Sequence, residues 1–148
     1  MNWQRDGIVI STDKQSLDTR YIHEFLSNHS YWAAQIPYDT VCRSIEGSLC
    51  FGVFEQGRQK GFARVITDQA TFAYLADVFI DPACRGRGLG QFLLEVIVNH
   101  PRLQGLRSWM LATRDAHGLY ARFGFEPLEE PQRFMRKADP DVYKKAIN

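Results

Sequence analysis

The sequence has little of several features that mark specialised classes of protein. Only three of its 148 residues are cysteines, and their odd number and wide spacing argue against a disulfide scaffold or a zinc site. The 18 lysines and arginines exceed the 17 aspartates and glutamates by one, so no overall field favours nucleic acid or an anionic membrane. No apolar run approaches the roughly 20 residues of a membrane-spanning helix, and the polar amino terminus does not resemble a secretory signal. We therefore expect a cytoplasmic protein with no nucleic-acid, membrane or metal partner.

Internal repeats, low-complexity stretches and flexible linkers are also missing, so we predict one domain over residues 1–148. Apolar runs predict strands at 8–10, 48–55, 61–67, 72–80, 108–112, 125–128 and 134–137. Helical spacing of apolar residues predicts helices at 18–28, about 38–45, about 90–100 and 115–123, with a polar tail from residue 139. This order is typical of an α+β fold with a mostly antiparallel sheet and interspersed helices.

A glycine-rich loop follows the strand that we expect to end at Ile80. Residues 85–90 read Arg-Gly-Arg-Gly-Leu-Gly and lie between that strand and an amphipathic helix. Glycines can take positive φ and let an anion approach the backbone N–H groups at a helix start, and arginines add charge-assisted hydrogen bonds. The loop therefore suits a diphosphate, although a flexible strand-to-helix connection is the alternative.

Two common phosphate-binding loops do not match this pattern. A nucleotide P-loop needs Gly-Lys-Ser or Gly-Lys-Thr, and no lysine here precedes serine or threonine. A dinucleotide-binding fold needs a different glycine spacing and strands that alternate with helices from the start. A nucleotide-binding regulator is therefore disfavoured.

The residues from Val78 to Gly90 resemble the acyl-CoA signature of the GNAT acetyltransferase superfamily. That signature is Arg or Gln, two residues, Gly, one residue, then Gly or Ala, and it is matched by Arg85, Gly88 and Gly90. A later family motif is matched in the right order by Ala116, Leu119-Tyr120 and Gly124-Phe125. The resemblance covers nearly the whole chain and is specific over about residues 72–128. It implies a GNAT-like central sheet that is mostly antiparallel, twisted, splayed in the middle and flanked by helices.

The resemblance also implies an N-acetyltransferase that uses acetyl-CoA as its acyl donor and needs no metal. The acceptor is a primary amine of a small molecule, peptide or protein, which attacks directly. The implied donor-binding residues are Val78, Phe79, Ile80, Arg85, Gly86, Arg87, Gly88, Leu89, Gly90, Thr113 and Tyr120. Thr113 departs from the asparagine that many members carry there. A non-catalytic acyl-CoA sensor or interaction domain is the alternative.

Tyr120 is implied to be the general acid for the departing thiolate. A phenol hydrogen-bonded to sulfur stabilises the charge that develops there. Backbone N–H groups of Val78 or Ile80 can polarise the thioester carbonyl if the strand splays from its neighbour. A core aromatic on an apolar helix is the alternative for Tyr120.

Asp77 is the first candidate for the general base, because it interrupts an otherwise apolar strand beside the implied thioester site. An exposed or paired carboxylate, or an anion that binds the amine, is the alternative. His117, Glu55 and His23 are further candidates, and chains of water molecules can also remove the proton.

Tyr31, Trp32 and Tyr38 lie between the first two predicted helices and are candidates for the acceptor pocket. Their rings can hold an apolar or cationic acceptor, or they can simply cover the core. Cys84 is a candidate acyl-accepting thiol, but it lacks a histidine at informative spacing, and direct attack by the amine is preferred. The sequence leaves a homodimer open.

Overall fold

The computed structural model describes residues 1–147 and contains one mixed sheet of six strands. The strands lie side by side in chain order: β1 (Asn2–Arg5), β2 (Ile8–Ser11), β3 (Leu49–Glu55), β4 (Arg58–Thr67), β5 (Phe72–Ile80) and β6 (Ser108–Met110). Neighbouring strands are antiparallel except β5 and β6, which are parallel. The helices are α1 (Thr19–His29), α2 (Tyr38–Glu46), α3 (Leu89–Val98), α4 (His117–Ala121) and α5 (Val142–Ile147). The expected α+β architecture is confirmed.

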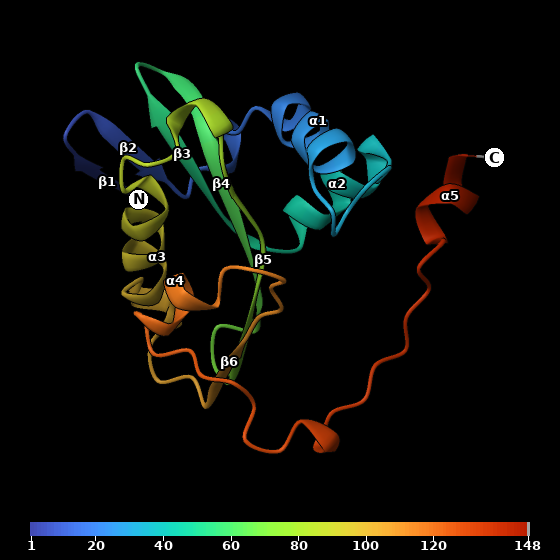
Figure 1. Cartoon of the computed structure of the whole chain (residues 1–148). Helices are drawn as coiled ribbons and strands as arrows, with labels where there is room; N and C mark the ends of the chain where they lie inside the picture. Colours follow the sequence, from blue (N-terminus) through green and yellow to red (C-terminus); the bar gives the residue numbers. More distant parts are fainter. Residues whose placement is uncertain (148) are drawn as a thin grey trace.

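The helices cover the two faces of the sheet and create two hydrophobic clusters. Helix α3 packs on one face, where Leu93 and Ile97 are fully buried beside apolar residues of β2, β3 and β4. Helices α1 and α2 pack on the other face, around Ile22 and Phe62 (Figure 1). The α1 sequence folds locally because Asp18 caps it by accepting a hydrogen bond from the Tyr21 N–H at 3.0 Å. Helices thus cover both faces of the sheet. The edge at β5 and β6 remains open for a site.

Strand β5 contains a bulge in its pairing with β4, and its pairing with β6 is short. Ala63 of β4 alone faces two residues of β5, Asp77 and Val78, and Asp77 has a φ of 54°. Strand β6 pairs with β5 only as far as Tyr74. Beyond that residue the two parallel strands diverge, which is the splay that the family resemblance implies.

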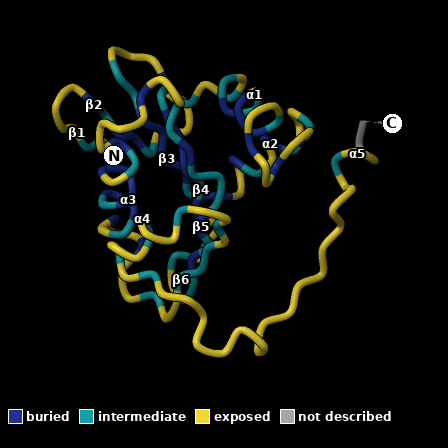
Figure 2. The backbone as a smooth tube through the Cα atoms, in the orientation of Figure 1, coloured by how far each residue is buried: buried dark blue, intermediate teal, exposed yellow. Residues whose placement is uncertain are grey.

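Two sequence predictions were wrong at the carboxyl end. Residues 125–128 and 134–137 are not in strands, because no neighbouring strand pairs with either segment within residues 1–147. The chain after residue 128 leaves the body and runs along an exposed path to α5 (Figures 1 and 2). Strand β1 was missed because its residues are polar, although the Asp6-Gly7 turn, with both φ values positive, is typical of a hairpin.

None of the helices within residues 1–147 has the length and apolar character needed to cross a membrane.

Candidate active site

The glycine loop after β5 has the backbone conformation that an anion site needs. Gly86 and Gly88 both have a φ of 78°, and a Cβ added to either would meet nothing within 4 Å. Gly88 is the N-cap of α3 and no side chain caps that helix, so its first amides and its partial positive charge face outward. Gly90 lies inside the first turn of α3 and, unlike Gly86 and Gly88, does not take a positive φ.

A cavity of about 440 Å³ lies beside this loop and is called the loop cavity here. Its lining includes most of the predicted donor-binding residues: Val78, Phe79, Ile80, Arg85, Gly86, Gly88, Leu89, Gly90 and Tyr120. Phe79 and Leu89 are also core residues, and the Phe79 ring stacks on Phe25 with centroids 3.9 Å apart. Their side chains therefore form the part of the cavity wall that adjoins the hydrophobic core.

The two arginines of the loop differ in their surroundings. Arg85 lines the loop cavity, and only its Nε is engaged, in a 3.3 Å hydrogen bond to the Ile80 carbonyl. Arg87 does not line the cavity, because both of its terminal nitrogens donate to the Glu55 carboxylate. This pair lowers the pKa of Glu55 through its hydrogen bond with Arg87. Of the two loop arginines, Arg85 is therefore the one that is available to an anion in the cavity.

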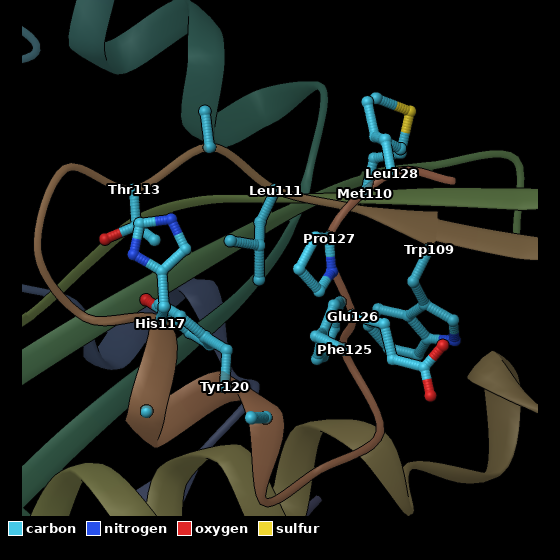
Figure 3. Close-up of a pocket in the computed structure, with 13 residues that line it drawn as sticks. Trp109, Met110, Leu111, Thr113, His117, Tyr120, Phe125, Glu126, Pro127 and Leu128 are labelled. Atoms are coloured by element: carbon cyan, nitrogen blue, oxygen red, sulfur yellow. The ribbon is translucent and has the colours of Figure 1, made fainter. Parts of the chain in front are cut away.

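Tyr120 projects from α4 to the meeting point of three cavities. Besides the loop cavity it lines a central cavity of about 440 Å³, between the diverging strands β5 and β6, and a C-terminal cavity of about 540 Å³ (Figure 3). Burial raises the pKa of Tyr120 to about 12, with smaller contributions from Tyr31 and Asp115. The phenol therefore keeps its proton throughout the neutral and mildly alkaline range.

Asp77 is a paired carboxylate. One of its oxygens accepts from the Trp32 indole N–H at 2.8 Å and the other accepts from Arg64 Nε at 2.8 Å. The Asp77 and Arg64 side chains are only 10% and 16% exposed, and Arg64 also donates to the Ser48 hydroxyl at 3.0 Å. The carboxylate thus fixes Trp32 at the wall of the central cavity.

The connection between α1 and α2 supplies two aromatic residues to the walls of the site. Tyr31 and Trp32 line both the loop cavity and the central cavity. The Tyr31 hydroxyl accepts from the Arg114 backbone N–H at 2.9 Å, and the Arg114 guanidinium lies 3.9 Å from the centre of the Tyr31 ring. Tyr38 lines none of these cavities and instead packs edge-on against His23, with centroids 5.5 Å apart.

The remaining candidates occupy several places. Thr113 lines the central and C-terminal cavities, and its hydroxyl accepts from the Ala116 N–H at 3.1 Å. His117 lines the C-terminal cavity, and His23 is hydrogen-bonded to the Ile36 carbonyl at 2.9 Å. Cys84 is buried and lines the loop cavity. Over residues 1–147, histidine, cysteine, aspartate and glutamate side chains form no group of three that could hold a metal ion.

Sequence reasoning missed Arg114 and Asp115, which line the central and loop cavities between the two family motif positions Thr113 and Ala116. Their position directly before Ala116, the alanine of the second family motif, could have identified them as candidates.

Comparisons with known proteins identify the family of the chain. Residues 46–127 match the family model described as an acetyltransferase (GNAT) domain. The chain belongs to the GNAT family. A provisional acetyltransferase of Gibberella zeae is 33% identical to it, and the match covers 82% of this chain and 80% of the relative. The crystal structure of a provisional GNAT acetyltransferase from Xanthomonas campestris pv. campestris is 51% identical, has a TM-score of 0.91 and covers 95% of this chain and 99% of that one.

A more distant solved structure shares the fold alone. Glucosamine-6-phosphate N-acetyltransferase from Arabidopsis thaliana is 15% identical and has a TM-score of 0.64, with 90% of this chain and 99% of that one covered. The family, and acetyl transfer as its chemistry, thus follow from the closer relatives, whereas the fold is common to all of them.

Proposed function

We propose that the protein is an acetyl-CoA-dependent N-acetyltransferase that acts on a primary amine. Membership of the GNAT family supports acetyl transfer. The observation that carries the proposal is the position of Tyr120, whose side chain lines both the loop cavity and the central cavity. One phenol can therefore contact a donor in the first cavity while an acceptor occupies the second.

The loop residues fit the diphosphate of coenzyme A. The left-handed Gly86 and Gly88 leave open space over the backbone, the start of α3 is uncapped, and Arg85 has terminal nitrogens to spare. The pantetheine arm would follow β5, where backbone groups beyond Tyr74 have lost their partner strand β6. The N–H groups of Val78 or Ile80 would there polarise the thioester carbonyl.

The reaction is a direct transfer between substrates. The amine nitrogen attacks the thioester carbonyl carbon, the carbon–sulfur bond breaks with its electron pair on sulfur, and the amine loses a proton to water. A thiol has an ordinary pKa near 8.5, so full proton transfer from Tyr120, with a pKa of about 12, is uphill by about 5 kcal/mol. Tyr120 therefore acts mainly by donating a hydrogen bond to the developing thiolate.

Asp77 is a positioning residue in this proposal and the base is water. Both carboxylate oxygens already accept hydrogen bonds, from Trp32 and Arg64. The acceptor is a small amine that enters the central cavity against the Tyr31 and Trp32 rings, which are 46% and 41% exposed. Tyr38 has no part, because it lies outside the cavities.

Titration calorimetry with acetyl-CoA and a thiol-release assay with a panel of primary amines test the proposal together. We expect donor binding that weakens in Arg85→Ala and changes little in the control Arg87→Ala, because Arg85 lines the loop cavity and Arg87 does not. We also expect amine-dependent thiol release. Binding without release across the panel would favour the acyl-CoA sensor, and absence of binding would refute both functions.

A further inference from the structure

A further cavity, of about 510 Å³, lies away from the candidate active site and is called the far cavity here. Its walls come from the β2–α1 connection, the start of β3, the β4–β5 turn and the segment after α3. These connections lie at one end of the sheet, where β5 begins, whereas the glycine loop follows the other end of β5. The far cavity shares no lining residue with the loop, central or C-terminal cavities. It is therefore a separate place at which a ligand can bind.

Positive charge predominates in the lining of the far cavity. Lys14 and Arg102 face the single carboxylate Asp13, and the amino-terminal residue Met1 also lines the cavity. The guanidinium of Arg102 has no hydrogen-bond or ion-pair partner within residues 1–147, and Lys14 Nζ donates only to the Glu46 carbonyl, at 3.0 Å. The chain as a whole carries a net charge of only +1, so this excess is local. Unpaired cations around a hollow attract an anion.

His100 adds a neutral donor that the core holds in place. The residue is only 3% exposed, and the rings of Trp3 and Phe51 pack against its imidazole with centroids 5.6 Å away. Nδ1 accepts a hydrogen bond from the Arg102 backbone N–H at 3.0 Å, which places the ring proton on Nε2. Burial, together with the nearby charge of Arg102, lowers the pKa of His100, so the ring is neutral at pH 7.

The Nε2–H of His100 has no partner in the part of the chain that the structure describes. Every fully buried polar side-chain atom there does have a partner, so Nε2 is not sealed in the core and reaches the surface where His100 lines the far cavity. The Phe51 ring lies edge-on to the imidazole, and an aromatic ring is a weak acceptor that does not replace an oxygen. The role of His100 in capping the segment after α3 uses Nδ1 alone. A fixed and unpaired donor therefore indicates a ligand oxygen.

We propose that the far cavity binds a small metabolite through an oxyanion, either a carboxylate or a phosphate group. The Nε2–H of His100 donates to one oxygen, and the side chains of Arg102 and Lys14 bind the others by charge-assisted hydrogen bonds. A volume of about 510 Å³ lies within the range of small-molecule sites, so the cavity has room for more than the oxyanion itself. The site is separate from the acetyl-transfer site and does not depend on the proposed function.

The imidazole of His100 reports binding directly. In proton–nitrogen correlation NMR spectra of the histidine rings, we expect Nε2 of His100 to shift saturably when inorganic phosphate or succinate is added at millimolar concentration. The pH and ionic strength are kept constant, so that general screening does not contribute. The rings of His23, His29 and His117 are internal references, because none of them lines the far cavity.

Substitution of the exposed cations tests the site without disturbing the core around His100. Arg102→Ala should weaken binding of either probe about 10-fold, because it removes a charge-assisted hydrogen bond. The double variant Lys14→Ala/Arg102→Ala should weaken it further. The control Arg58→Ala removes the same charge from the exposed start of β4, outside the far cavity, and should bind like the wild type. Circular dichroism should be the same for all of these proteins.

The two probes distinguish the possible ligands. A saturable shift with phosphate alone indicates a phosphorylated metabolite, a shift with succinate alone indicates a carboxylate, and shifts with both indicate a site for either group. Absence of a His100 shift with both probes would overturn the proposal. Equal affinities of the wild type and Arg102→Ala would also overturn it. None of these results depends on acetyl transfer, so the proposed function is tested separately.

Discussion

Replacement of Tyr120 by phenylalanine removes one hydroxyl from the meeting point of the loop and central cavities. In the proposed mechanism this hydroxyl donates to a sulfur that becomes negatively charged only as the carbon–sulfur bond breaks. A hydrogen bond to a charged group contributes about 1.5–3 kcal/mol, and each 1.36 kcal/mol is tenfold in rate. We therefore expect kcat to fall roughly 10- to 150-fold, with little change in the KM for acetyl-CoA.

The assay is steady-state thiol release at saturating amine, and the matched control is Tyr38→Phe. That control deletes the same atom from a tyrosine outside all three cavities, so its kcat should stay within about twofold of the wild type. A loss well above 150-fold, towards about 10⁴-fold, would indicate full general-acid catalysis instead of hydrogen bonding. A Tyr120→Phe enzyme within threefold of the wild type in single-turnover experiments would refute the role of the phenol.

Three further predictions follow from single features of the site. Gly88→Ala should lower the free energy of unfolding by about 1–2 kcal/mol in urea titrations, because Gly88 has a φ of 78°. It should also weaken acetyl-CoA binding in calorimetry. The control Gly90→Ala should change neither quantity. Asp77→Asn should lower the free energy of unfolding by about 1.5–3 kcal/mol, since it leaves Arg64 without its charged partner. If this variant also loses the acidic limb of the pH profile of kcat/KM, Asp77 is the base. Because the pKa of folded Tyr120, about 12, exceeds its ordinary value of 10, the folded state holds this proton more tightly. The stabilisation from this protonated phenol is complete below pH 10 and is lost as the pH rises towards 12. Between these pH values, the melting temperature of Tyr120→Phe should therefore fall less than that of the wild type.

The local parts of the site could be predicted from the sequence. The loop lies within six consecutive residues, so the pattern alone indicated the left-handed conformation of Gly86 and Gly88. The strand before the loop and the helix after it carry their own apolar periodicity. Tyr120 likewise lies within a short motif on one helix. Such features depend on neighbours in the chain, which one sequence displays directly.

The parts that depend on distant partners could not be predicted. Arg87 looked equivalent to Arg85 until the structure brought Glu55, 32 residues away, against it. The pairing of Asp77 with Trp32 joins residues 45 positions apart, and it places the candidate base against the wall of the central cavity. These outcomes depend on how the strands and the α1–α2 connection pack, which periodicity does not encode.

The carboxyl-terminal strands show a different limit. Residues 125–128 and 134–137 have the composition of strands, but a strand needs a neighbour for its backbone hydrogen bonds. A single copy does not supply one within residues 1–147.

The bulge at Asp77 restricts which amino acids this position can accept. With a φ of 54°, a β-branched or bulky side chain there would be strained, and only Gly, Asn and Asp take such a conformation readily. Glycine would relax the backbone but would release the indole of Trp32, and asparagine would keep the shape without the charge. The bulge in β5 and the anchoring of the aromatic wall therefore depend on the same residue, so few substitutions can change one of them without the other.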